Sequence, residues 1–141
     1  MRILGIDYGD KNIGIAISDP FGWTAQGLEI IRRENESEYK KTVRRIAEII
    51  ADYEVESIVL GYPKNMNNTE GVRCEKTKAF KERLEKRFPG MEVILWDERL
   101  STMGAERFLT EGGITKERKK AVIDKMAAVH ILQGYLDSIG H

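Results

Sequence analysis

The first 31 residues contain three strand-like segments with no helical pattern between them, whereas helical and strand patterns alternate in the rest of the chain. Residues 2–7 and 12–18 are short and rich in isoleucine, and a third segment ends near residue 31. The connection 8–11 contains a glycine for a positive φ angle and an aspartate for turn hydrogen bonds, which predicts a β-hairpin. The chain therefore begins with an antiparallel meander.

The later segments are separated clearly by their periodicity. From residue 38 to about 53, apolar residues form one helical stripe and charged residues occupy the other side, which predicts a surface helix. The remaining predicted elements are a buried strand at 57–60, a charged helix from about 72 to 88 stopped by Pro89–Gly90, a strand at 91–96, a helix capped by Ser101 or Thr102, and a last helix from about 119 to 138.

This order predicts an α/β fold with a mixed five-stranded sheet, in which an antiparallel meander precedes parallel strands and helices cover both faces. The layout resembles the RNase H fold. A length of 141 residues is typical of one domain, so residues 1–141 are expected to form a single domain.

Charge and composition limit the possible partners. Lys plus Arg number 23 and Asp plus Glu also number 23, so no overall positive field attracts nucleic acid, and any such partner must be held locally. A single cysteine, no signal peptide and no apolar run near 20 residues predict a cytoplasmic protein with no membrane contact.

Three carboxylates occupy unusual positions. Asp7 ends the first strand, Glu98 directly follows another strand, and Asp124 shares the inner face of the last helix with small residues such as Ala128. Burial and mutual repulsion raise the pKa values of clustered carboxylates, and a divalent cation reverses both effects. The three acids therefore predict a site for one or two Mg²⁺ or Mn²⁺ ions and a metal-dependent phosphodiesterase, most simply a nuclease.

Each acid also has an ordinary explanation when it is taken alone. Asp7 can hydrogen-bond the amides of the turn that follows it, and Glu98 can form a surface ion pair with the next arginine. Asp124 can pair with Lys120 or Lys125, or lie exposed near the start of its helix. The joint pattern favours the metal site.

Four motifs in order resemble the YqgF family over almost the full chain. They are Gly5-Ile-Asp-Tyr-Gly-Asp-Lys-Asn-Ile-Gly-Ile-Ala16, Gly61-Tyr-Pro-Lys-Asn-Met66 with Thr69-Glu-Gly71, Asp97-Glu-Arg-Leu-Ser-Thr102, and Val122-Ile-Asp-Lys-Met-Ala-Ala128 with Ile131-Leu-Gln133. Members of that family are RNase H-like proteins regarded as Holliday junction resolvases and as nucleases that mature the small-subunit ribosomal RNA precursor.

The resemblance implies that Asp7, Glu98 and Asp124 are the metal-binding catalytic acids. It further implies a hydrolase that processes the 5′ end of pre-16S rRNA in ribosome biogenesis. Two departures concern the substrate loop, since Tyr62 replaces the usual Leu and Asn67–Asn68 replaces the usual Asp-Gly.

Candidate substrate contacts surround the acids. Lys11 can contact a phosphate from the hairpin turn, and Asn65 and Thr69 lie in a loop that follows a strand end, as binding loops in open α/β sheets often do. The basic candidates for the phosphate backbone are Arg73, Lys76, Lys78, Lys116, Arg118, Lys119 and Lys120. Trp23, Trp96 and Phe108 are expected to fill the core rather than stack on bases.

Competing functions come from different classes of protein. The first motif also resembles the phosphate loop of actin-like and sugar-kinase ATPases, but 141 residues lack their second lobe. A Holliday junction resolvase needs two paired sites and therefore a homodimer, whereas RNA trimming needs one site, so a monomer or a weak homodimer is expected. A non-catalytic RNA-binding factor that acts on ribosomal particles is the third alternative.

Overall fold

A computed structural model of the chain describes residues 2–62, 71–97 and 116–139, with the backbone alone described for residues 116–125. The elements, in chain order, are β1 (Arg2–Asp7), β2 (Asn12–Ser18), β3 (Ala25–Arg32), the 3₁₀ helix η1 (Glu36–Glu38), α1 (Tyr39–Tyr53), β4 (Val55–Tyr62), α2 (Val72–Arg87), β5 (Glu92–Asp97) and α4 (Lys116–Ser138). Every element predicted in these ranges is present, and the helix predicted after Ser101 lies outside them.

The five strands form one mixed sheet in the order β3-β2-β1-β4-β5. The pairs β1–β2 and β2–β3 are antiparallel, whereas β1–β4 and β4–β5 are parallel. The parallel pairs arise because β4 and β5 are each preceded by a helix, α1 and α2, which returns the chain so that the next strand runs in the direction of β1. The predicted RNase H-like α/β fold is confirmed.

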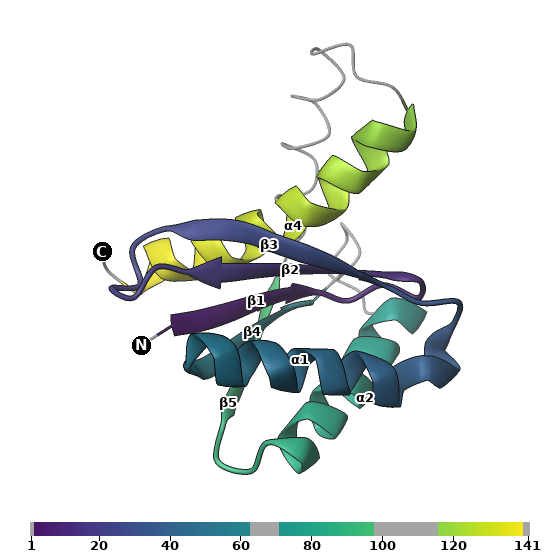
Figure 1. Cartoon of the computed structure of the whole chain (residues 1–141), viewed down its shortest axis with the longest axis horizontal. Helices are drawn as coiled ribbons and strands as arrows, with labels where there is room; N and C mark the ends of the chain where they lie inside the picture. Colours follow the sequence, from purple (N-terminus) through teal and green to yellow (C-terminus); the bar gives the residue numbers. More distant parts are fainter. Residues whose placement is uncertain (1, 63–70, 98–115, 140–141) are drawn as a thin grey trace.

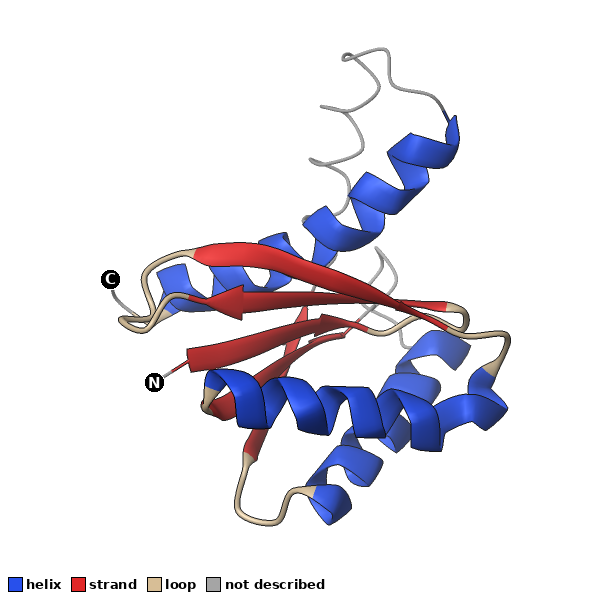
Figure 2. Cartoon of the chain, viewed as in Figure 1, coloured by secondary structure: helices blue, strands red, loops and turns tan. Residues whose placement is uncertain are grey.

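Helices cover both faces of the sheet, with α1 and α2 on one face and α4 on the other (Figures 1 and 2). Strand alternation divides the core in the same way. In β1, Leu4 and Ile6 belong to the cluster that packs against α1 and α2, whereas Ile3 belongs to the cluster that packs against Ala128 and Leu132 of α4.

Local signals explain where two helices end. The helix α1 stops at Glu54, whose φ of 54° is left-handed and whose backbone N–H bonds the carbonyl of Ile50. The predicted stop at Pro89–Gly90 is confirmed, because α2 ends at Arg87 and Gly90 has a φ of 87°. No helix in the described parts of the chain is long and apolar enough to cross a bilayer.

The prediction that Trp23 fills the core is wrong. Its side chain is 65% exposed, because Trp23 lies in the β2–β3 turn, beyond the end of the sheet. The Asp19 carboxylate closes this turn by accepting a hydrogen bond of 2.8 Å from the Trp23 backbone N–H. Trp96 does pack against the α4 cluster, edge-on to Tyr135 with ring centroids 5.9 Å apart. Phe108 lies outside the described residues.

Candidate active site at the carboxyl edge of the sheet

The strands β1, β4 and β5 run in the same direction, so their carboxyl ends lie at one edge of the sheet. Ile6, Leu60 and Leu95 are in register across the three strands. Asp7 follows at the end of β1, and Asp97 ends β5 opposite Tyr62. Strands lie about 4.8 Å apart, which places β5 about 10 Å from β1. Such an edge is where open α/β sheets commonly bind ligands.

Asp7 is placed on the face of the sheet that α4 covers. Side chains alternate along a strand, so Asp7 shares a face with Gly5. A Cβ atom on Gly5 would lie 2.7 Å from the Cβ of Leu132 and 3.2 Å from the carbonyl oxygen of Ala128. Gly5 thus marks where α4 crosses β1, and the half-buried Asp7 lies about 7 Å further along the strand.

The direction of α4 carries residue 124 toward the same edge. Ala128 contacts β1 at Gly5, whereas Gln133 bonds the backbone N–H of Ala25, at the edge where β1 begins. The helix therefore runs antiparallel to β1, as Figure 1 also shows. Asp124 precedes Ala128 by one turn, or about 6 Å. Its backbone lies in α4 and its side chain is not among those described.

Glu98 directly follows Asp97 and lies outside the described residues. Among the described side chains, no three His, Cys, Asp or Glu residues come close enough to hold a metal ion. Glu98 and the Asp124 side chain are not among these described side chains. The convergence of the three acids therefore remains a prediction.

Arg33 donates hydrogen bonds to the turn that follows Asp7, a role that was not predicted from the sequence. Arg33 is 7% exposed. Its guanidinium donates hydrogen bonds to the Asp10 carbonyl at 2.8 Å, the Tyr8 hydroxyl at 2.8 Å and the Gly9 carbonyl at 3.2 Å. A further bond of 3.3 Å reaches the Thr42 hydroxyl of α1. A planar group with five donors can satisfy several fixed acceptors at once.

The reason for glycine at position 9 differs from the one predicted. The positive φ expected of Gly9 is not observed, since the described glycines with positive φ are Gly22 and Gly90. A Cβ atom at Gly9 would instead lie 2.5 Å from the carbonyl oxygen of Asn12. Glycine is required here by the close approach of two backbone segments.

Cationic side chains lie beside this turn. Lys11 is exposed within the turn itself. Arg73, from the first turn of α2, approaches the Tyr8 carbonyl with its Nη2 at 3.5 Å, which places it next to the residue that follows Asp7. The predicted contacts Lys11 and Arg73 are thus both near the strand end that carries Asp7.

Lys76 has a different role from a free phosphate contact. Its ammonium pairs with Glu36 at 2.6 Å and with Asp10 at 3.4 Å. The hydrogen bond to Glu36, followed by the one to Asp10, raises the pKa of Lys76 above its ordinary value. These two ion pairs join α2 to the turn through Asp10 and to η1 through Glu36, so Lys76 helps to fix the turn.

The other predicted contacts are placed only in part. Asn65 and Thr69 lie outside the described residues, in the segment that follows the end of β4. Arg118 and Lys119 lie in the first turns of α4, and their side chains are not described. Lys78 lies over the ring of Tyr62 at 5.6 Å from its centroid.

Comparison with known proteins identifies close relatives. The family model described as "RuvX: Holliday junction resolvase" matches residues 1–138. A protein of Agathobacter rectalis named "Putative pre-16S rRNA nuclease" is 57% identical over 141 residues, which is 100% of this chain and 98% of the relative.

Two solved structures share the fold at low sequence identity. RuvC of T. thermophilus in complex with a Holliday junction substrate has a TM-score of 0.57 at 12% identity, over 99% of this chain and 96% of the other. The fowlpox virus resolvase in complex with Holliday junction DNA has a TM-score of 0.58 at 18% identity, over the full length of both chains. These likenesses support the fold alone.

Proposed function

The chain belongs to the RuvX family, and from this membership we propose that it is a nuclease that hydrolyses phosphodiester bonds in precursor 16S ribosomal RNA. The observation that carries the proposal is the placement of Asp7. It ends β1 at the edge where β4 and β5 also end, and it lies on the face that α4 covers. The name of the 57% identical relative supports ribosomal RNA as substrate.

Asp7, Glu98 and Asp124 would hold one or two Mg²⁺ or Mn²⁺ ions. Carboxylate oxygens are the donors that these hard cations prefer. Asp7 fits this role because it is half-buried at a strand end where waters and phosphate oxygens can approach. When bound, the ions would supply an activated water and neutralise charge on the leaving oxygen.

The other residues of the site position the substrate. Lys11 and Arg73 contact phosphates on either side of the scissile bond, and Asn65 and Thr69 contact the strand from the loop after β4. Arg118 and Lys119 extend the phosphate contacts along the start of α4. Arg33 holds the Tyr8–Lys11 turn through three hydrogen bonds and donates a fourth to Thr42 of α1, so the backbone that carries Asp7 does not shift when the substrate binds.

Cleavage of a four-way DNA junction is the second candidate, because the family model is described as a Holliday junction resolvase. Two symmetric cuts require two copies of the site, so this activity predicts a homodimer on the junction. Trimming of RNA in a ribosomal particle requires one copy. The Asp7→Asn variant distinguishes a non-catalytic RNA-binding factor from both enzymes, because an enzyme would lose cleavage and keep RNA binding.

A parallel digestion tests the proposal. Single-stranded RNA, precursor ribosomal RNA and a four-way DNA junction are incubated with the protein and Mg²⁺ or Mn²⁺, and the products are resolved on a gel. Asp7→Asn, Glu98→Gln and Asp124→Asn are each expected to lower the cleavage rate by more than about 100-fold. Loss of a residue that only hydrogen-bonds a metal ligand can already cost about 100-fold, and loss of the ligand itself should cost more. Binding of the preferred substrate should persist.

The matched control is Asp52→Asn, which removes an exposed acid near the end of α1. It should cleave like the natural protein. Undiminished cleavage by all three site variants would refute the proposed role of the acids. Binding of precursor RNA without cleavage by the natural protein would favour the assembly factor.

A further inference from the structure

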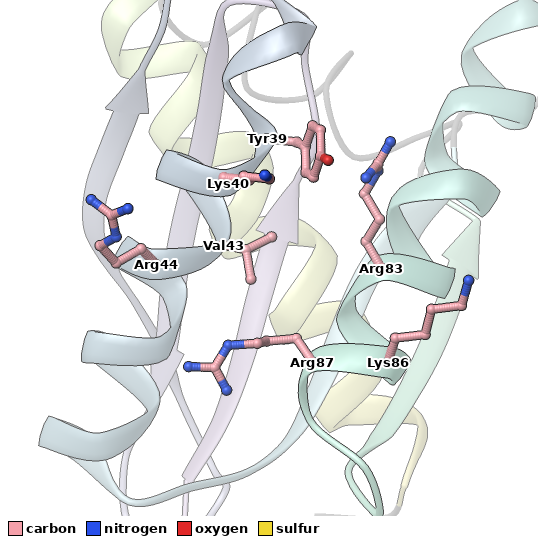
Figure 3. Close-up of a pocket in the computed structure, with 7 residues that line it drawn as sticks. All are labelled: Tyr39, Lys40, Val43, Arg44, Arg83, Lys86 and Arg87. Atoms are coloured by element: carbon pink, nitrogen blue, oxygen red, sulfur yellow. The ribbon is translucent and has the colours of Figure 1, made fainter.

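The helices α1 and α2 lie on the face of the sheet opposite to α4 (Figure 1), and side chains of both helices line a groove between them (Figure 3). Its volume is about 480 Å³. The buried Val43 forms part of its floor, and the half-buried Tyr39 forms part of its wall. The function proposed above does not use this groove.

The charge of the groove lining is of one sign. Five of the lining residues are cationic and exposed, and none is acidic: Lys40, Arg44, Arg83, Lys86 and Arg87. The whole chain has equal numbers of basic and acidic residues, so an evenly mixed surface would include both. Within the described residues, none of the five lies within 4.0 Å of a carboxylate oxygen. The groove therefore concentrates positive charge in a protein whose formal net charge is zero.

The cations form two rows. Lys40 and Arg44 are four residues apart on α1, and Arg83 and Arg87 are four residues apart on α2, so each pair lies on one helix face about 6 Å apart. Like charges at this spacing destabilise a helix slightly, and both α1 and α2 contain such a pair. Two rows suit an extended polyanion better than a single phosphate, which would be held by converging donors.

The side chains at the centre are preorganised. The guanidinium carbon of Arg83 lies 3.5 Å from the centroid of the Tyr39 ring, across the groove from α2 to α1. Figure 3 shows these two side chains facing each other, with Arg87 extending from α2 toward α1 beneath Val43. Arg44 and Lys86 lie on the outer flanks. Stacking on tyrosine reduces the freedom of Arg83 and leaves its N–H groups for a ligand.

We propose that the α1–α2 groove is a second binding surface for the substrate RNA, where Lys40, Arg83 and Arg87 contact the phosphate backbone at a distance from the cleavage site. This inference rests on the proposed function for the identity of the polyanion. The groove contributes affinity and holds the length of RNA that extends past the catalytic edge.

The geometry fixes how long such an RNA must be. The helix α2 begins at Val72, near the carboxyl edge, and rises about 17 Å before it reaches Arg83. A helical strand advances about 3.4 Å per nucleotide, so at least about five nucleotides separate the edge from the groove. An RNA of about 5 nucleotides cannot fill both surfaces, whereas one of about 20 nucleotides can.

Two double variants with the same net charge test the proposal. Lys40 and Lys41 are adjacent exposed residues of α1, and only Lys40 lines the groove. Lys40→Gln/Arg87→Gln removes two groove cations, whereas Lys41→Gln/Arg87→Gln removes one. Both are made in the full chain with Asp7→Asn, so that RNA is not cut, and binding of 5- and 20-nucleotide fluorescent RNAs is titrated against salt, lengths chosen from the ~3.4 Å rise per nucleotide.

The slope of log K against log salt measures the number of phosphate contacts. Each contact to a single strand contributes about 0.7 to the magnitude of this slope. For the long RNA, the magnitude of the slope should therefore fall by about 1.4 with the first variant and by about 0.7 with the second. The short RNA should show no difference between the variants. Unchanged melting curves confirm that both variants are folded.

Equal slopes for the two variants on the long RNA would overturn the proposal, as would equal losses on the short and long RNA. A slope change on a four-way DNA junction and none on RNA would overturn the assignment to RNA. The proposed nuclease fails on a different observation, namely absence of cleavage by the protein with Asp7 intact, so the two failures are distinguishable.

Discussion

Gly5 of β1 and Leu132 of α4 are in contact so close that a Cβ atom on Gly5 would lie 2.7 Å from the Cβ of Leu132. The contact sets the distance of α4 from the sheet on the face where Asp7 lies. Gly5 is followed by Asp7 two residues later, and Leu132 is preceded by Asp124 two turns earlier. The close packing thus links core structure to the proposed site.

Gly5→Ala should push α4 away from the sheet. Extra carbon in a packed core costs about 1–3 kcal/mol, so the midpoint of thermal unfolding should fall, and cleavage should fall with it because Asp124 moves. Differential scanning calorimetry and a cleavage assay check both effects.

The matched control is Gly134→Ala on α4, where the atoms nearest to the added Cβ belong to the Trp96 side chain, with Nε1 at 3.0 Å. Alanine also favours the helix by about 1 kcal/mol over glycine, so this variant should lose less stability than Gly5→Ala. A greater loss at position 134 than at position 5 would contradict this explanation of the packing.

The sheet could be predicted from the sequence because its pattern is local. Isoleucine-rich segments separated by short turns predict the meander, and the amphipathic segment that forms α1 lies between β3 and β4, the strand that pairs in parallel with β1. The position of Asp7 followed from the same pattern, since the end of the first strand was visible in the sequence.

Features that depend on segments distant in the sequence could not be predicted. Arg33 is buried only because the 8–11 turn presents three oxygen acceptors to it, and nothing in the adjacent pair Arg32–Arg33 indicates which arginine is buried. Trp23 was expected in the core from its residue type, but its turn projects past the sheet. The basic groove joins helix faces about 40 residues apart in the sequence, so neither face shows it alone.

Arg33→Lys is predicted to loosen the turn after Asp7. Lysine keeps the charge but cannot reach the carbonyls of Asp10 and Gly9 and the Tyr8 hydroxyl at the same time. Each buried acceptor left without a donor costs about 1–3 kcal/mol, so the free energy of unfolding should fall by at least that amount. The maximal cleavage rate should fall more than KM rises, because the turn positions Asp7.

Arg32→Lys is the control for this prediction, since Arg32 is exposed and adjacent to Arg33 in the sequence. It should leave the unfolding free energy within about 0.5 kcal/mol of the natural protein. Urea denaturation and steady-state kinetics measure the two variants. A stable Arg33→Lys variant with an unaltered cleavage rate would show that the hydrogen bonds of Arg33 are not needed to position the site.

Removal of divalent metal is predicted to stop cleavage and to lower stability. A ligand present at 100 times its Kd stabilises the folded state by about 2.7 kcal/mol, so adding Mg²⁺ or Mn²⁺ to chelator-treated protein should raise the melting temperature. Asp7→Asn should reduce this increase, and Asp52→Asn should not. An equal increase in both variants would mean that the ion binds elsewhere.

Arg73→Gln is predicted to weaken substrate binding without changing the fold. Arg73 is exposed, and the contact of its Nη2 with the Tyr8 carbonyl oxygen, at 3.5 Å, is too long to contribute much to stability. Loss of one phosphate contact should lower the salt slope of RNA binding by about 0.7 and raise KM, while the maximal rate stays near that of the natural protein. Arg73→Lys, which keeps the charge, should restore most of the slope. A Lys variant as weak as the Gln variant, with both melting normally, would instead assign Arg73 a geometric role that needs the guanidinium.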